Sequence, residues 1–149
     1  MPQDSVPSDG DVAFSVEGVT NPDGGMMTKV NTEVALLDNT RPVSIKTRSV
    51  CQRQIIMTFD EPLNFRENAN EVTAAKNFKV KIGSSTITIL KAAVVNGKRT
   101  VTLDLGSDLP DAGDITIKVV ADANGNINII DASQNKNPLN DDMTYTIDR

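Results

Sequence analysis

The sequence contains no histidine and only one cysteine, Cys51. An internal disulfide, a zinc site built from Cys and His, and a Ser-His or Cys-His nucleophile are therefore excluded within these residues. These absences remove most hydrolase chemistry, and we expect the chain not to be an enzyme. Cys51 begins a segment of alternating apolar residues, which predicts a small core side chain rather than a reactive thiol.

Aromatic and basic residues are also scarce. Trp is absent, and only one Tyr and four Phe are available as ring faces on which bases or sugars could stack. The formal charge is -5 and the Lys and Arg residues do not cluster, which disfavours contact with a phosphate backbone. We therefore expect no nucleic acid partner and no small-molecule substrate.

Long apolar runs are missing too. No stretch of 18 apolar residues occurs, so we expect no membrane insertion. The N-terminal residues MPQDSVPSDG lack the charged and then apolar pattern of a signal peptide, and an export signal would have to lie outside this sequence.

What the sequence does contain is apolar residues at every second position, rich in Val, Ile and Thr. This period is typical of half-buried strands, and Asn96-Gly97 between two such runs predicts a hairpin. Many short strands joined by Gly, Pro and Asn turns predict an all-β, antiparallel β-sandwich of the immunoglobulin-like kind. The expected core residues are Ile45, Ile55, Met57, Phe59, Phe78, Val80, Val101, Leu103, Ile115, Ile117, Val119 and Tyr145.

One segment departs from the strand pattern. Residues 67–77 have the composition of one or two helical turns, and Asn70 is the expected N-cap. The segment is too short to form a layer of its own.

An internal echo links the two ends of the chain. An alternating strand runs into an Asx-x-x-Gly turn at residues 11–25 and again at 114–126, and a further strand follows each turn. This pattern indicates one period of a tandem array, with a disordered tail at 1–10, the closing hairpin of a preceding module at 11–39 and a complete module at 40–149. The alternative is a single domain whose first strands merely resemble its last.

The order of signals in 41–126 resembles the bacterial immunoglobulin-like modules of S-layer and related surface proteins. The matching pieces are Arg41-Pro-Val-Ser-Ile, Thr58-Phe-Asp-Glu-Pro62, Asn77-Phe-Lys-Val80, Arg99-Thr-Val-Thr-Leu-Asp-Leu105, Leu109-Pro-Asp-Ala-Gly113, Ile115-Thr-Ile-Lys-Val119 and Asp122-Ala-Asn-Gly-Asn126. The resemblance implies a structural module at the bacterial cell surface or cell wall. Its partners would be neighbouring modules or copies of the same protein, often with calcium.

Residues 127–142 are longer than the corresponding loop of the N-terminal echo. An extra edge strand or an interaction loop could occupy this segment. Two other functions therefore stay open: an adhesin or ligand-binding module that uses 127–142, and an accessory domain of an extracellular enzyme.

The adjacent acids Asp60 and Glu61 form the most conspicuous candidate site. Successive strand residues point to opposite faces, so the two carboxylates would not converge on one substrate atom. With Pro62 expected to end the strand, the pair is interpreted as a polar strand exit, with a cation contact as the alternative.

A second candidate is the turn at 122–126, where oxygen-bearing residues alternate as in the first part of a calcium loop. The Gly and Glu of an EF-hand are missing where Ile127 and Ser133 stand, so an Asx turn is favoured. Calcium would then require ligands from several segments. The candidate ligands are Asp60, Glu61, Asp122, Asn124, Asn126, Asp131, Asp141 and Asp142.

Overall fold

A computed structural model describes residues 6, 9–26 and 28–148 of the chain. The chain divides into two compact units. The first comprises residues 1–40 together with 133–135, and the second comprises 41–132 together with 136–149. Most of the tail predicted at 1–10 lies outside the described residues.

The first unit contains one antiparallel hairpin. Strands β1 (Gly10–Val16) and β2 (Val30–Leu36) pair along their full length, from Gly10 opposite Leu36 to Val16 opposite Val30. Next to this hairpin, Val6 and Asn39 exchange two hydrogen bonds: the Asn39 N–H donates to the Val6 carbonyl, and the Val6 N–H donates to Asn39 Oδ1.

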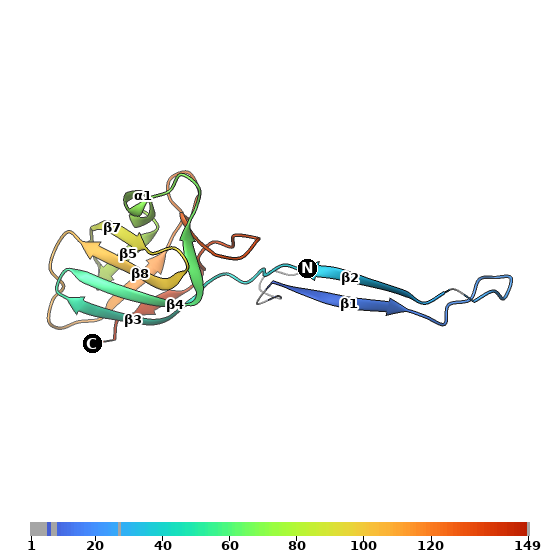
Figure 1. Ribbon diagram of the computed structural model, residues 1–149. Coiled ribbons are helices and arrows are strands. Elements are labelled where there is room, and N and C mark those ends of the chain that lie inside the picture. The colour runs from blue at the N-terminus through green and yellow to red at the C-terminus, as the bar shows by residue number, and fades with distance from the viewer. Residues whose placement is uncertain (1–5, 7–8, 27, 149) are drawn as a thin grey trace. The chain divides into compact units, whose positions relative to one another are not determined.

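The second unit contains two antiparallel sheets (Figure 1). The first sheet has the order β10-β4-β8-β7. β3 also pairs with β4, along residues 54–59, whereas β10 pairs with residues 63–65. Its strands are β3 (Ser44–Cys51), β4 (Gln54–Phe65), β7 (Ile89–Val94), β8 (Lys98–Leu105) and β10 (Ile129–Asp131). The predicted hairpin is confirmed, because β7 and β8 are joined by a turn at Asn96-Gly97 in which the Lys98 N–H donates to the Val95 carbonyl.

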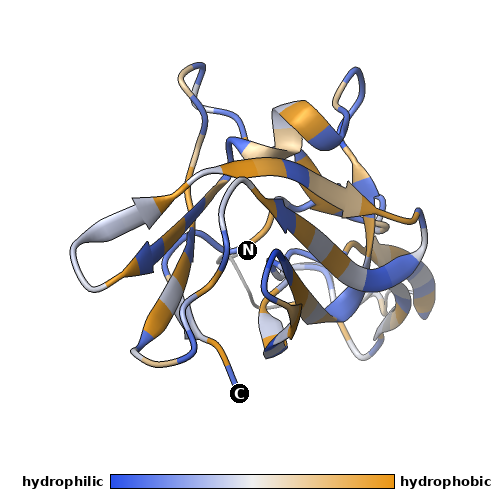
Figure 2. Cartoon of the chain, turned by 90° about the vertical axis from the view of Figure 1, so that its left-hand side faces the viewer, coloured by the Kyte–Doolittle hydropathy of each residue, from blue (hydrophilic) through white to orange (hydrophobic). Residues whose placement is uncertain are grey.

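The second sheet has the order β11-β9-β5-β6. Its strands are β5 (Phe78–Ile82), β6 (Ser85–Ile87), β9 (Ile115–Val119) and β11 (Thr144–Thr146). In β5 and β9 the apolar residues alternate with Lys or Thr, and the apolar positions are the buried ones apart from the half-buried Ile82. Figure 2 shows this alternation as apolar and polar bands along the strands.

Both sheets contribute to one apolar core. Eleven of the twelve predicted core residues are buried, among them Met57, Phe59 and Val101, each with no exposed surface. Full burial of an aliphatic or aromatic side chain of this size stabilises a fold by about 1.5–3 kcal/mol. The structure is mostly β with antiparallel sheets, as the period-two pattern predicts, and it contains one short helix.

Two burial predictions in β3 are wrong. Ile45 is 65% exposed, because the pairing of β3 with β4 shifts register between Ser44 and Lys46 and the alternation of faces is interrupted there. Thr47 is the buried residue of β3 instead. Cys51 is exposed rather than part of the core, since it lies at the end of β3 where the chain turns into β4.

The helical expectation is confirmed. Helix α1 (Glu71–Ala75) begins after the N-cap Asn70, whose side chain accepts hydrogen bonds from the N–H groups of Val72 and Thr73. Ala74 and Ala75 are buried, and α1 packs against β7. No helix in the described ranges has the length and apolarity needed to cross a membrane.

Pro62 does not end the strand that contains the acidic pair, contrary to expectation. Strand β4 continues to Phe65, although its pairing with β8 shifts register between Thr58 and Leu63. Beyond Pro62 the strand gains a new neighbour, β10, with Leu63 opposite Asp131. Pro62 therefore marks a change of pairing partner rather than a strand exit.

Residues 127–142 include the extra edge strand that was one of the two expectations for this segment. Strand β10 supplies it, and Ile127, Ile129, Ile130 and Leu139 are buried. Most of the segment is thus part of the packed structure.

Candidate functional site

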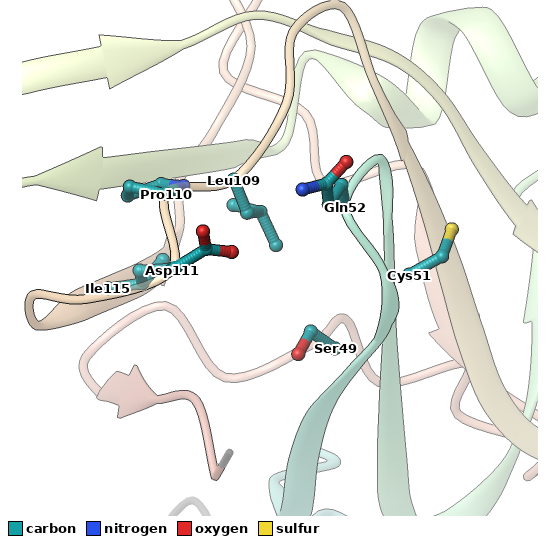
Figure 3. A pocket seen from close by; sticks show the side chains of 7 residues that line it. All are labelled: Ser49, Cys51, Gln52, Leu109, Pro110, Asp111 and Ile115. Carbon is teal, nitrogen blue, oxygen red and sulfur yellow. The ribbon is translucent and has the colours of Figure 1, made fainter.

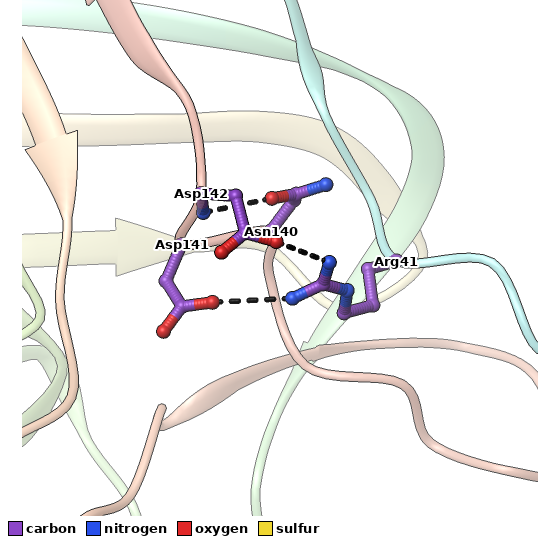
Figure 4. Close-up of polar contacts among 4 residues, drawn as sticks. All are labelled: Arg41, Asn140, Asp141 and Asp142. Carbon is purple, nitrogen blue, oxygen red and sulfur yellow. Dashed lines mark hydrogen bonds and ion pairs between the residues drawn. The ribbon is translucent and has the colours of Figure 1, made fainter. Parts of the chain in front are cut away.

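Arg41 links the start of the second unit to two of the candidate calcium ligands (Figure 4). Its Nη1 lies 3.2 Å from Asp141 Oδ1, and its Nη2 lies 2.6 Å from Asp142 Oδ2. The Asp142 N–H also donates to Asn140 Oδ1, and the Asn140 N–H donates to the Pro42 carbonyl. Asp141 and Asp142 therefore act as counterions that hold the segment before β11 next to the start of β3.

Asp60 has a structural role at the beginning of β3. Its N–H donates to the Val43 carbonyl over 3.1 Å, and its Oδ1 accepts from the Val43 N–H over 3.0 Å. The guanidinium of Arg99 donates to the Asp60 carbonyl. These bonds fix the chain where β3 begins to pair with β4.

Glu61 lies near a different acid. A carboxylate oxygen of Glu61 and one of Asp131 lie within 4.8 Å of each other. Glu61 is half-buried and Asp131 is buried. Two carboxylates at this separation repel one another, and a bound cation would offset that repulsion. This pair is thus the part of the predicted ligand set whose geometry suits a metal ion.

The Asp131 carboxylate also closes the loop that follows β10. Its Oδ1 accepts from the Asn137 N–H over 3.0 Å, and its Oδ2 accepts from the Asn137 side-chain amide over 2.8 Å. The Asp131 N–H donates in turn to the Asn137 carbonyl. The loop is therefore held at its base, and Asp131 is kept in place beside β4.

The turn at 122–126 is the Asx turn that was favoured over a calcium loop. Asp122 Oδ1 accepts from the N–H groups of Asn124 and Asn126, and Gly125 has φ +77°. Asp122 Oδ2 accepts from the Asn128 side-chain amide. The bond from the Asn126 N–H, followed by that from Asn128, lowers the pKa of the Asp122 carboxyl below its ordinary value. This carboxylate is occupied by protein donors.

A buried amide network beside this turn was not anticipated from the sequence. Asn77 has no exposed surface, and its Nδ2 donates to the carbonyls of Val120 and Asn126. Its Oδ1 accepts from the N–H and from the side-chain amide of Asn128. The network ties the loop after β9 to the start of β5. Asn77 is the first residue of the motif Asn77-Phe-Lys-Val80. The hydrogen bonds of its side chain explain why an asparagine suits this position.

A shallow pocket of about 230 Å³ lies at the end of the sheets where β3 turns into β4 (Figure 3). Leu109 and Ile115 are the buried apolar residues of its lining, and the thiol of Cys51 points away from Leu109. Asp111 is the single carboxylate in its described lining, so the pocket lacks an acid–base pair. Its full lining is Ser49, Cys51, Gln52, Leu109, Pro110, Asp111 and Ile115.

The eight candidate ligands thus do not assemble into one site. Asp141 and Asp142 contact Arg41, Asp60 contacts Val43, and Asp122 holds its own turn. Asn124 and Asn126 contribute main-chain N–H groups to that turn. Among the described acids, Asp60, Asp122, Asp141 and Asp142 belong to no group of three or more close carboxylates.

Solved structures with a similar fold come from an S-layer protein. The N-terminal part of the bacterial S-layer protein SbsC matches with a TM-score of 0.54 and 15% identity, over 72% of this chain and 24% of that one. The S-layer protein rSbsC(31-844) matches with a TM-score of 0.55 and 15% identity, over 73% of this chain and 14% of that one. The chain thus corresponds to a quarter or less of those proteins, and the expected resemblance to S-layer modules is confirmed.

The sequence itself matches no curated protein. Residues 37–123 match a family described as "Putative flagellar system-associated repeat". Because this match covers more than half of the residues, the chain belongs to that family of repeats.

Proposed function

We propose that the chain is a structural repeat module of a bacterial S-layer or a similar cell-surface protein. Its role is to hold neighbouring modules or copies of the same protein through protein–protein contacts, outside the cell. The observation that carries this proposal is the fold shared with SbsC, in a chain that belongs to a repeat family. The family description names a flagellar system, so the same structural role at a flagellum is a second candidate.

The strand order supports an immunoglobulin-like sandwich as the form of the module. One sheet follows the order β3-β4-β8-β7 and the other the order β11-β9-β5-β6. In an immunoglobulin-like sandwich, the first, second, fifth and fourth main strands form one sheet, and the remaining strands form the other. β3, β4, β8 and β7 take those four positions when β6 and β10 are counted as additional edge strands.

A non-catalytic role is supported by the use that the fold makes of its polar side chains. Among the acids singled out in the sequence, Asp60, Asp122 and Asp131 accept from main-chain N–H groups, and Asp141 and Asp142 pair with Arg41. The pocket where β3 turns into β4 holds a single carboxylate in its described lining. The adhesin alternative loses support because the apolar residues of 127–142 are buried. The exposed residues of this segment are Ala132, Gln134, Asn135, Lys136 and Asp142.

Calcium is the cofactor that the proposal includes. The close carboxylates of Glu61 and Asp131 are its candidate ligands, and a cation there would stiffen the region where β4 changes partner. Calcium takes six to eight oxygen ligands, so main-chain carbonyls and water would complete the shell.

Sedimentation velocity over a range of protein concentrations tests the structural role. A lattice module self-associates as the concentration rises, and the association is expected to strengthen when calcium replaces a chelator. A chain that stays monomeric throughout both series would contradict a lattice function.

A further inference from the structure

The echo between the two units extends further than one strand and one turn. Val6-Pro-Ser-Asp-Gly-Asp-Val-Ala-Phe-Ser-Val16 aligns without a gap with Leu109-Pro-Asp-Ala-Gly-Asp-Ile-Thr-Ile-Lys-Val119. Proline, glycine, aspartate and the final valine recur at equal spacing. The run that leads into β1 is therefore equivalent to the run that leads into β9.

The two turns that follow share one hydrogen-bond pattern. In the first, the Asn21 N–H donates to the Gly25 carbonyl, the Gly24 N–H donates to the Asn21 carbonyl, and the Gly25 N–H donates to Asn21 Oδ1. The same three bonds connect Asp122 with Gly125 and Asn126. Gly24 and Gly125 both have positive φ, 82° and 77°. The two turns thus share three hydrogen bonds and a glycine with positive φ at the same position.

The strands that flank these turns differ in the number of their partners. β9 pairs with β11 on one side and with β5 on the other. β1 pairs with β2, the equivalent of β11, and has no second strand partner in the described part of the chain. The edge of β1 that corresponds to the β5 side is open.

Exposure at equivalent positions shows the same difference. Val119 in β9 has no exposed surface, whereas its counterpart Val16 in β1 is 47% exposed. The Ile147 N–H donates to the Ile115 carbonyl, and Val34 lies opposite Val12, the counterpart of Ile115. Ile147 is 8% exposed, whereas Val34 is 43% exposed. A hairpin of this pattern has an apolar face suited to a sheet that faces it.

From these equivalences we infer that β1 and β2 complete a second sandwich of the same family. The open edge of β1 pairs with a β5-type strand of that partner, and the opposite sheet of the partner covers Val16 and Val34. This inference rests on the proposed repeat function and identifies the partner of the hairpin. The sandwich it completes would otherwise lack the counterparts of β9 and β11.

The register of the partner strand follows from β5 and β9. Phe78 pairs with Val119 and Ile82 with Ile115, while Lys79 and Lys81 point away from the core. The partner strand therefore has an apolar residue opposite Val16, another opposite Val12, and polar residues between them.

An extended chain tests the inference. Residues 41–108 are placed directly before Val6, which is then followed by the present sequence to its end. This joins the echo at its aligned position and supplies an upstream sandwich that lacks β9, β10 and β11, of which the hairpin has counterparts of β9 and β11. Amide hydrogen exchange by NMR is measured on the present chain and on the extended one.

The expected result is that the amides of β1 exchange rapidly in the present chain and become as protected as those of β9 in the extended chain. The added residues should give dispersed, folded resonances. An upstream segment that stays unfolded, or β1 amides that remain unprotected, would overturn the inference. Sedimentation of the extended chain, in which the upstream sandwich covers β1, tests self-association through the outer surface, so its failure would count against the proposed function alone.

Two variants of the extended chain make the result specific. Val34→Asp places a carboxylate on the apolar face and should unfold the upstream sandwich while β3 to β11 of the downstream one stay folded. Ala35→Asp, one residue further along β2 and on the other face, is the matched control and should leave both folded. Equal behaviour of the two variants would refute the assigned face. A further chain, in which residues 41–149 precede Val6, checks that an upstream copy folds when it keeps its own β9, β10 and β11.

Discussion

Asn77 Oδ1 accepts two hydrogen bonds from Asn128, one from its main-chain N–H at 2.8 Å and one from its side-chain amide at 2.9 Å. The two residues are 51 positions apart in the sequence. Both are buried, and Asn128 also reaches Asp122 Oδ2 and the Thr73 carbonyl. One amide pair therefore joins helix α1, the start of β5 and the loop after β9.

Replacing Asn77 by alanine should destabilise the module strongly. The change removes the acceptor of the buried Asn128 N–H and a donor to the half-buried carbonyls of Val120 and Asn126. A buried polar group left without a partner costs about 1–3 kcal/mol. Because the bonds form one network, we expect a total loss of roughly 2–4 kcal/mol in the free energy of unfolding by urea. Asn124→Ala, at an exposed position of the neighbouring turn, is the control and should change stability little. A small effect of Asn77→Ala would show that the network has no stabilising role.

Arg41→Gln should lower stability by about 1 kcal/mol at low salt, because the guanidinium is largely enclosed and bonds to two carboxylates. Arg53→Gln removes the exposed pair with Asp108 and should have no measurable effect. Thermal unfolding of both variants in low and high salt checks the comparison, and the Arg41 effect should shrink as salt screens the pair. Equal losses would show that burial of Arg41 does not matter.

The pKa of Tyr145 should lie above its ordinary value of about 10, because burial of the ring disfavours the phenolate. The Tyr145 hydroxyl accepts a hydrogen bond from the Ser44 N–H, and this bond only partly offsets the burial. Tyr145 is the sole tyrosine and Trp is absent, so the ultraviolet absorbance of the phenolate reports this one group. Titration in denaturant should return the ordinary value.

The same shift links Tyr145 to stability at alkaline pH. The folded chain keeps the proton longer than the unfolded chain does, so the contribution is fully present below the unfolded pKa and is lost as pH rises through the folded one. The melting temperature should therefore fall more steeply above pH 10 in the wild type than in Tyr145→Phe. Parallel curves for the two proteins would exclude this linkage.

Calcium should raise the melting temperature if Glu61 and Asp131 hold the ion. A single site stabilises by about 2.7 kcal/mol when free calcium is 100 times Kd. Glu61→Gln should abolish both the calorimetric heat and the stabilisation, whereas Glu67→Gln, at an exposed position, should preserve them. No heat in the wild type, with the same melting temperature in chelator, would rule the site out.

The antiparallel strands and nearly the whole core could be predicted from local patterns. Alternation in β5, β8 and β9 is regular, and each buried residue there occupies the position that the period assigns. The turn at Asn96-Gly97 and the N-cap at Asn70 depend on neighbouring residues only. Such features can be recognised in a short stretch of the sequence.

Ile45, Cys51 and Pro62 show where that approach fails. Each lies where the pairing with a neighbouring strand shifts or ends, and a register shift depends on both strands. The apolar pattern of one strand does not contain this information. Burial at these positions is therefore determined by pairing.

The polar contacts could not be predicted for a similar reason. Arg41 meets Asp142 across 101 residues, and Asn77 meets Asn128 across 51. The sequence identified Asp141, Asp142 and Asp122 as candidate calcium ligands. Their partners follow from the order of strands, which places the start of β3 beside the segment before β11.

The edges of the two sheets have a consequence for solubility. β6, β10 and β11 are three residues long, β7 is packed against α1, and β3 carries Lys46 and Arg48 and two register shifts. Short, charged or irregular edges resist edge-to-edge aggregation, so crowded copies of the sandwich can remain dispersed. Among the described strands, β1 and β2 each have a seven-residue outer edge whose sheet contains no register shift. Uncontrolled polymerisation at high concentration should therefore begin at this hairpin.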